Sequence, residues 1–429
     1  MPVGPGLEWA RSGAMALTGE SEGPPGFAGG GLATAARGAG QALAALAPGA
    51  GFEALDAPAL LGERAALFGF GRRGRGSCGG SARLVAARDG ALAVNLPRDD
   101  DWRLLEAWLE APLGDIEARR DWAAVEQAIA KREAAGLVER GREIGLAVAL
   151  AVPACDAPPR PFRLEHATRS AAPERGASSR NLRRPRVLDL STLWAGPLAG
   201  ALLAQAGFDV LKLESASRPD GAREGVPAFF DLLHAGKRGG TLDLAARRDR
   251  EVFIRLLDAA DVVLESARPR ALAQLGFDAS AWVGARPGRL WASITGYGRD
   301  HEWIAFGDDA AVAAGLAFDP EGDRLRFCAD AVADPLTGLY AAVAIAGLQS
   351  EGRGGLLSLA LAEVAAHAAG AGGGAELVLP RRLREGAWTV LDGDGAETVA
   401  PPRARPAVAA APALRPIEPA LVEAWTRPC

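Results

Sequence analysis

Cysteine and histidine are scarce in this chain of 429 residues, which has four of each. The cysteines form no Cys-x-x-Cys pair and the histidines lack the spacing of metal ligands, so the sequence predicts neither a disulfide framework nor a metal site. Zinc-dependent hydrolysis is therefore disfavoured. Widely separated, reduced thiols are typical of the cytoplasm, and a cytoplasmic location is expected.

Long apolar runs and concentrations of one charge are also absent. No window of about eighteen apolar residues avoids glycine, proline and charge well enough to span a membrane. The chain starts without the basic segment of a signal peptide. With a formal net charge of −5 and no concentrated basic stretch, it is not expected to bind nucleic acid. Its 49% hydrophobic and 24% charged residues indicate an ordinary globular protein, long enough for two or three domains.

The clearest structural pattern begins at Arg186, where short apolar strands alternate with helices. This alternation predicts a parallel sheet with helices on both faces, which is an α/β fold. The expected strands are residues 187–190, 209–214, 240–244, 261–265 and 290–294, and the expected helices include residues 196–207 and 248–259.

Common ligand motifs are missing from this predicted sheet. The turn after its first strand, residues 191–200, is not Gly-x-Gly-x-x-Gly, and Pro197 lacks the N–H that a pyrophosphate needs. Residues 186–370 contain neither a Walker A sequence nor a Gly-x-Ser-x-Gly nucleophile elbow. NAD, ATP and serine-triad chemistry are thereby disfavoured, which leaves a carboxylate-centred mechanism as the remaining option.

The rest of the chain is expected to form three further segments. Residues 156–185 are rich in proline, arginine and serine, and we expect an exposed linker there. The sheet domain is expected to span residues 186–375, and a C-terminal segment to span residues 376–429. This segment is predicted to contain a hairpin that turns at Asp392-Gly393 and a Pro/Ala-rich tail on the surface. Residues 1–155 form a first block, with helices expected at 35–46, 99–109, 122–134 and 137–143 and strands at 82–87, 91–96 and 146–152.

Asp334 is the most informative single residue. It stands directly before Pro335 and heads an apolar run that predicts a buried helix. Asp is favoured at the N-cap and Pro at the first helical position, so Asp334 is predicted to cap this helix. The helix dipole should lower its pKa and keep it ionised. Capping alone explains the residue on local grounds, and a nucleophilic role is the alternative.

From Arg186 to about Gly370 the chain resembles the class III CoA-transferases of the CaiB/BaiF type, which include formyl-CoA transferase, carnitine CoA-transferase and α-methylacyl-CoA racemase. The resemblance implies a Rossmann-like parallel sheet plus a smaller α+β domain, an interlocked homodimer, acyl-CoA and carboxylate substrates, and no separate cofactor beside coenzyme A. It rests on segments that follow the family's order, namely residues 187–197, 207–214, 236–244, 260–269, 275–277, 293–298 and 307–309.

The resemblance also implies roles for individual residues. Asp334, followed by Gly338, occupies the place of the nucleophile that attacks an acyl-CoA thioester and passes through a mixed anhydride and an aspartyl-CoA thioester. Leu193 and Ala195 lie in the turn that approaches CoA in relatives, and Lys237 matches a lysine that can meet the CoA phosphates.

The Gly307-Asp308-Asp309 segment stands where relatives have Gly-Tyr-Asp or Gly-His-Asp, which implies that Asp309 lies at the substrate site. The racemases pair their catalytic aspartate with the histidine of this segment. Asp308 stands at the position of that histidine, so racemisation is a disfavoured alternative. A pair of acids capping the helix that starts near residue 310 is the simpler interpretation of Asp308.

Two departures keep a catalytically inactive CoA-binding protein open as an alternative. Ser215 and Gln274 stand where relatives place arginines for the nucleotide end of CoA; three nearby arginines can substitute or can be ordinary solvated residues, namely Arg218, Arg268 and Arg270. The first block resembles a partial, degenerate copy of the family that includes a small domain. Aligned on Gly38 and Gly338, it has Thr34 where the second copy has Asp334.

Overall fold

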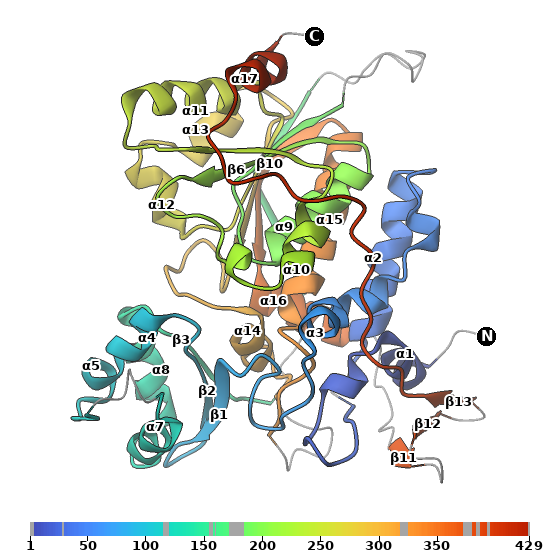
Figure 1. Cartoon of the computed structure of the whole chain (residues 1–429), viewed down its shortest axis with the longest axis vertical. Helices are drawn as coiled ribbons and strands as arrows, with labels where there is room; N and C mark the ends of the chain where they lie inside the picture. The colour runs from blue at the N-terminus through green and yellow to red at the C-terminus, as the bar shows by residue number, and fades with distance from the viewer. Residues whose placement is uncertain are drawn as a thin grey trace.

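A seven-stranded sheet forms the centre of the protein, in the strand order β4-β10-β9-β8-β5-β6-β7 (Figure 1). The computed structural model describes residues 4–27, 30–114, 120–153, 158, 160–170, 184–317, 325–371, 380–382, 387–392 and 395–427. Neighbouring strands are parallel except at β4, which runs antiparallel to β10. The strands are β4 (Arg163–Arg169), β5 (Arg186–Asp189), β6 (Asp209–Ser215), β7 (Arg238–Leu242), β8 (Val262–Glu265), β9 (Leu290–Thr295) and β10 (Arg353–Ala360).

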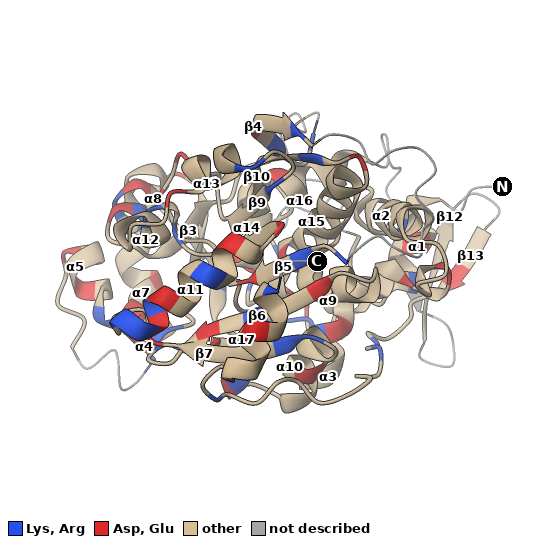
Figure 2. Ribbon diagram, turned by 90° about the horizontal axis from the view of Figure 1, so that it is seen from above, with Lys and Arg blue, Asp and Glu red and all other residues tan. Residues whose placement is uncertain are grey.

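Helices cover both faces of this sheet, as the alternating pattern predicts. The central strands β8 and β9 are buried along their whole length, because a sheet covered on both sides leaves no residue facing water. The predicted α/β fold is therefore confirmed. The helices of this part are α9 (Ala195–Gln205), α10 (Pro227–His234), α11 (Arg247–Ala259), α12 (Pro269–Gln274), α13 (Ala279–Ala285), α14 (Gly307–Ala313), α15 (Ala333–Ser350) and α16 (Leu361–Gly370). Acidic and basic residues are interspersed on outer helices such as α11 (Figure 2).

The strand order reverses direction between β5 and β8. From β5 the chain proceeds outward through β6 and β7, and it then returns to the other side of β5 with β8, β9 and β10. Loops at the carboxyl ends of such strands diverge at this switch point, which is where open α/β sheets bind ligands. Here the Thr192 N–H donates a hydrogen bond of 3.0 Å to the Ser266 hydroxyl and joins the two loops.

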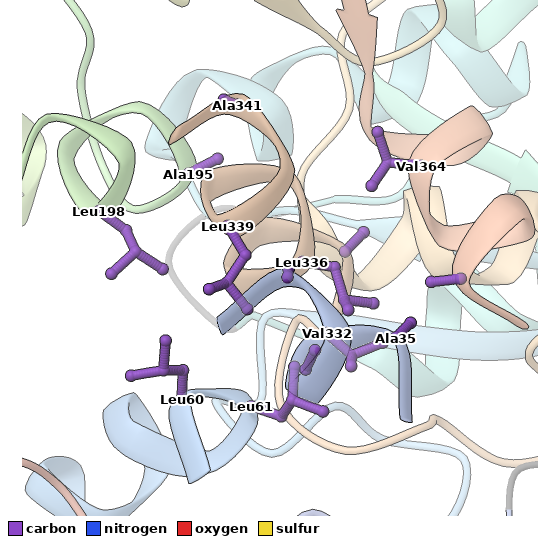
Figure 3. Close-up of a cluster of buried hydrophobic side chains, with 14 of the residues drawn as sticks. Ala35, Leu60, Leu61, Ala195, Leu198, Val332, Leu336, Leu339, Ala341 and Val364 are labelled. Carbon is purple, nitrogen blue, oxygen red and sulfur yellow. The ribbon is translucent and has the colours of Figure 1, made fainter. Parts of the chain in front are cut away.

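Helix α15 lies deep in the main core, against α9 and against α2 (Leu32–Leu46) of the first block (Figure 3). Leu336 and Leu339 are fully buried, and Gly338 permits a close helix contact, because a Cβ there would lie 2.7 Å from the Ala195 carbonyl oxygen. Shortening either leucine to alanine would cost about 2–5 kcal/mol of folding free energy. This packing fixes the start of α15 relative to the turn that precedes α9.

The first block has two structural parts. Helices α1 (Pro5–Ser12), α2 and α3 (Glu63–Phe68) lie beside the large sheet, and apolar residues of this segment share its core. Residues from β1 onward build a small antiparallel sheet, β1-β2-β3, with its own core of apolar and tryptophan side chains. Its elements are β1 (Ala82–Ala86), β2 (Ala91–Asn95), α4 (Asp99–Arg103), α5 (Leu105–Leu109), α7 (Trp122–Ile129), α8 (Ala134–Glu143) and β3 (Ala147–Leu150).

The expected linker is wrong over part of its length. Residues 163–169 form β4, which pairs with β10 at the edge of the large sheet, with Glu165 opposite Leu356. Most β4 side chains are exposed, so no apolar alternation marks this strand in the sequence. Residues 171–183 of the predicted linker lie outside the described residues.

The C-terminal segment begins with the predicted hairpin and ends in an anchored helix. Strands β12 (Trp388–Asp392) and β13 (Gly395–Thr398) pair antiparallel, and β11 (Pro380–Arg382) pairs with β12. The chain then runs past the edge strand β7, where Thr241 exchanges backbone hydrogen bonds with Arg415 and Ile417 (Figure 1). Helix α17 (Pro419–Thr426) packs on α11 with Trp425 fully buried, so the tail is an integral part of the fold.

None of the helices in the described ranges is long and apolar enough to cross a membrane.

Candidate active site

Asp334 lies in the first turn of α15, close to the first turn of α14. The helix begins at Ala333 with Val332 at the N-cap, so the prediction that Asp334 is the N-cap is wrong by two residues: Asp334 is the second residue of the helix. Its carboxylate instead accepts a hydrogen bond from the Gly307 N–H. The approach is close enough that a Cβ on Gly307 would lie 2.5 Å from the Asp334 Oδ2 atom. Asp334 remains partly exposed, so a substrate can reach it.

Two further carboxylates and one guanidinium surround Asp334. Asp330 is fully buried and forms a bidentate pair with Arg64, with distances of 2.6 and 2.9 Å between nitrogen and oxygen atoms. Asp308 accepts a 2.9 Å hydrogen bond from the Ala331 N–H. Because Arg64 belongs to α3, the first block supplies the positive charge of a site whose carboxylates come from residues 308–334.

Burial determines the protonation of this carboxylate cluster. Burial raises the pKa of Asp334 to about 7, although Arg64 acts in the opposite direction; Asp308 and Asp330 raise it further by repulsion. The expectation that the helix N-terminus keeps Asp334 ionised is therefore not met: desolvation exceeds the helix-end effect. Burial likewise raises the pKa of Asp308 to about 6. The site thus holds carboxyl groups that titrate near neutrality.

Asp309 connects the site to the small sheet. Its Oδ1 atom accepts hydrogen bonds from the Asn95 amide of β2, at 2.9 Å, and from the Phe306 N–H, at 3.0 Å. Burial raises its pKa to about 7, and its side chain is fully buried. The position implied for Asp309, at the substrate, therefore differs from the observed one, in which Asp309 holds α14 against β2. The acids of this segment lie within the first turn of α14.

The turn before α9 presents Leu193 at the switch point. Leu193 is 42% exposed and has a left-handed backbone, with φ of 70°. Its N–H donates a 3.0 Å hydrogen bond to Asp220, and Asp220 also pairs with the buried Lys212 at 3.0 Å. Trp194 follows, with the Arg64 guanidinium 5.0 Å from its ring centre. Ala195 is buried at the start of α9, so Leu193 is the exposed member of the predicted CoA turn.

Lys237 does not meet the expectation of a phosphate-binding charge. Its ammonium group is completely buried and donates 2.9 Å hydrogen bonds to Asp189 Oδ2 and to the Pro197 carbonyl. Burial lowers the pKa of Lys237, whereas Asp189 raises it. The matching lysine is thus an internal partner of Asp189 that ties β5 to α9. Sequence position alone gave no sign of this burial.

The counterpart of the site in the first block has no carboxylate at the aligned position. Thr34 lies in the first turn of α2, and its hydroxyl donates a 2.5 Å hydrogen bond to Glu8 of α1. Arg37 pairs with the same carboxylate at 2.6 Å. Helices α1 and α14 are each followed by a left-handed glycine, Gly13 with φ of 86° and Gly315 with φ of 85°. The internal repeat stays a prediction.

Sequence reasoning missed the residues that the first block contributes. Arg64 and Asn95 contact carboxylates more than 200 positions further along the chain, with separations of 266 and 214 residues. No local motif marks them. In the described ranges, no group of three or more His, Cys, Asp or Glu side chains is arranged to hold a metal ion.

The fold and site together define a doubly wound α/β protein with a partly exposed carboxylate beside the switch point of its sheet. Residues 182–382 match CoA-transferase family III. The match covers 201 of the 429 residues, and it falls on the part of the chain in which the sequence resembles class III CoA-transferases.

Individual relatives match only part of the chain. The similarity to succinate–glutarate CoA-transferase of Agrobacterium fabrum is 30% identity and covers 37% of this chain and 44% of the relative. Succinyl-CoA:mesaconate CoA-transferase of Haloarcula hispanica is 35% identical over a segment that covers 26% of this chain and 31% of the relative. The crystal structure of a CaiB/BaiF family protein from Brucella suis matches with 27% identity and a TM-score of 0.42, covering 49% of this chain and 64% of that one. The chain thus spans less than half the length of these curated relatives.

Proposed function

We propose that this protein is an acyl-CoA transferase that moves CoA from an acyl-CoA thioester to a carboxylic acid, with Asp334 as the nucleophile. The observation that supports this best is the position of Asp334. It is the partly exposed member of the carboxylate cluster, it begins the helix packed on the switch-point turn, and its surroundings match CoA-transferase family III. Coenzyme A enters as a substrate, and no bound cofactor is proposed.

The proposed reaction conserves the thioester energy in covalent bonds to Asp334. The ionised carboxylate attacks the thioester carbonyl, forms a mixed anhydride and releases CoA thiolate. The thiolate attacks the aspartyl carbonyl of the anhydride, which yields aspartyl-CoA thioester and frees the donor acid. The acceptor carboxylate attacks this thioester, and the thiolate then attacks the acceptor's carbonyl, which releases Asp334 and the new acyl-CoA.

Arg64 has a defined part in this proposal. A nucleophilic carboxylate must be ionised, and a pKa of about 7 leaves Asp334 about half protonated at neutral pH. The guanidinium pairs with Asp330 and offsets the negative charge that accumulates beside Asp334. Positive charge from the first block therefore supports the ionised nucleophile.

Racemisation of an acyl-CoA is a second candidate, supported by one observation. Asp308 lies close enough to Asp334 to raise its pKa by repulsion, and burial raises the pKa of Asp308 to about 6 and that of Asp334 to about 7. Two such carboxyl groups can act as base and acid at an α-carbon. Asp308 is itself buried and bonded to the Ala331 N–H, which favours the transferase.

Hydroxylamine trapping tests the transferase. The full chain is incubated with a panel of acyl-CoAs, hydroxylamine is added, and mass spectrometry locates the hydroxamate. We expect a hydroxamate at Asp334 that disappears in Asp334→Asn and persists in the matched control Asp100→Asn, whose side chain is 81% exposed. Deuterium exchange at the α-carbon without CoA transfer would identify the racemase instead. Tight CoA binding without labelling or exchange from any donor would reject both reactions in favour of an inactive CoA-binding protein.

A homodimer and a cytoplasmic location are proposed on the strength of the family resemblance. Light scattering of the purified chain distinguishes a dimer from a monomer, since one chain has a mass of 44.2 kDa. Fractionation of the producing cells tests the location.

A further inference from the structure

A cavity of about 620 Å³ lies beside β1, the edge strand of the small sheet. It is bounded by β1, by α7 and by the loop of residues 73–80, in the part of the molecule at the lower left of Figure 1. Cavities of this size commonly bind small molecules. None of its lining residues belongs to the carboxylate cluster around Asp334, so the cavity is a separate feature of the first block.

The loop before β1 presents two arginines from a fixed backbone. The Leu84 N–H of β1 donates a 2.8 Å hydrogen bond to the Arg75 carbonyl, and the Gly74 carbonyl accepts one of 2.9 Å from the Phe327 N–H. Gly74 has a left-handed backbone with φ of 59°, which turns the chain between the two arginines. Because the loop is bonded on both sides, Arg73 and Arg75 keep their places beside the cavity.

Neighbouring arginines of this loop differ in what their guanidinium groups contact. Arg72 donates hydrogen bonds to three backbone carbonyls between residues 16 and 23, so its side chain braces the loop. Arg73 and Arg75 are exposed, and neither guanidinium forms an ion pair or hydrogen bond with another residue in the described ranges. A Cβ on Gly80 would lie 2.8 Å from the Arg73 Nη1 atom, which places this guanidinium at the cavity wall. Both groups are therefore available to a ligand.

Arg83 of β1 adds a third guanidinium to the lining. It pairs with Glu126 of α7 at 2.9 Å and lies 5.0 Å from the centre of the Trp122 ring. Among the described residues, Glu126 is the one carboxylate that lines the cavity. Glu20 approaches Gly74 on the loop but forms no ion pair with the two loop arginines in these ranges. Positive charge thus exceeds negative charge around the cavity.

Charge and surface chemistry together define a class of ligand. The planar fork of arginine donates two parallel hydrogen bonds to a carboxylate or phosphate group. The exposed side chains of Ala86 and Ala130 line the same cavity and offer apolar surface to the rest of a ligand. An inorganic ion would use the charges and leave this surface unfilled.

We propose that this cavity, here called the β1 cavity, binds a small organic oxyanion. Its phosphate or carboxylate group meets Arg73 and Arg75, and its apolar part lies against β1 and the end of α7, near Ala130. Arg83 remains paired with Glu126 and adds a longer-range attraction. The site goes beyond the proposed acyl-CoA transfer and does not depend on it.

Calorimetric titration of the full-length chain tests the proposal. The probes are phenyl phosphate, benzoate, inorganic phosphate and uncharged benzyl alcohol. We expect phenyl phosphate or benzoate to bind more tightly than the other two, and the tighter of these probes identifies the preferred anionic group. The double variant Arg73→Gln with Arg75→Gln should bind that probe about a hundredfold more weakly, at about tenfold for each guanidinium lost.

Two further variants separate a built cavity from general surface charge. Arg88→Gln combined with Arg247→Gln removes the same charge from side chains that are 59% and 93% exposed, and it should bind like wild type. Ala130→Phe fills the cavity without changing its charge, so it should weaken binding of the organic anion and spare that of inorganic phosphate. Thermal unfolding establishes that each variant is folded.

Three results would overturn the inference. They are affinity of the Arg73→Gln, Arg75→Gln variant within twofold of wild type, equal affinity of the wild-type protein for phenyl phosphate, benzoate and inorganic phosphate, and failure to bind either organic anion. The titration measures binding alone, so its outcome is independent of whether a hydroxamate forms at Asp334.

Discussion

Replacing Arg64 with glutamine removes a cation that lowers the pKa of Asp334. Arg64 is joined to Asp330 by two hydrogen bonds of 2.6 and 2.9 Å, and its side chain is only 24% exposed. Leaving the fully buried Asp330 without its partner should destabilise the fold by about 3 kcal/mol. The expected functional effect is separate from this loss and concerns the titration of Asp334, the proposed nucleophile.

The pKa of Asp334, raised by burial to about 7, should rise further without Arg64. A nearby opposite charge changes a carboxyl pKa by about one unit or more, so the ionised fraction of Asp334 at pH 7 should fall from about one half to about one tenth. In the proposed mechanism, only the ionised form of Asp334 attacks the thioester. We therefore expect kcat/KM at pH 7 to fall about fivefold and most of the activity to return near pH 9.

The assay is the pH profile of kcat/KM, or of hydroxamate formation at Asp334, for wild type, Arg64→Gln and Arg64→Lys. The lysine variant keeps a charge without the bidentate geometry and should have an intermediate midpoint, whereas the exposed control Arg247→Gln should match wild type. An equal loss of activity at every pH, with an unchanged midpoint, would mean that Arg64 only supports the structure and would refute the electrostatic reasoning.

Other substitutions and solution conditions test neighbouring parts of the site. Gly307→Ala should lower the proposed transfer at least tenfold and destabilise the fold by about 1–3 kcal/mol, because its Cβ would lie 2.5 Å from the Asp334 carboxylate. Gly38→Ala, with nothing within 4 Å of the added Cβ, should leave activity unchanged. The pKa of Asp309 is raised to about 7 in the folded state, against 3.8 for an ordinary aspartate, so between these values the folded state binds more protons than the unfolded state. The contribution of Asp309 to the free energy of unfolding therefore declines as pH rises from about 4 to 7. Urea midpoints should accordingly decrease less over this range in Asp309→Asn than in wild type. Lys237→Met should destabilise the protein by about 3–5 kcal/mol, because it leaves Asp189 unpaired, and adding Asp189→Asn should restore part of this stability. The CoA affinity of the folded variant should be unchanged. A large loss of CoA affinity without destabilisation would instead show that Lys237 contacts the CoA phosphates.

Local patterns in the sequence determined the secondary structure and the order of the large sheet's elements. Buried strands read as short apolar runs, and the helices between them follow the spacing of a covered parallel sheet. The helix headed by Asp334 was predictable because a long apolar stretch follows an acid and a proline. The strand β4 was not predictable, because an edge strand with exposed side chains has no apolar alternation.

Tertiary structure decided the electrostatics of the site and the identity of its partners. A pKa depends on burial and on every nearby charge, and those charges come from distant parts of the chain: Arg64 meets Asp330 across 266 positions. Lys237 was expected to bind a phosphate, but in the folded chain it is buried and pairs with Asp189. The sequence by itself thus determined the fold class and singled out Asp334. Only the folded chain could decide how Asp334 titrates and which residues of the first block surround it, since desolvation and long-range contacts leave no local pattern.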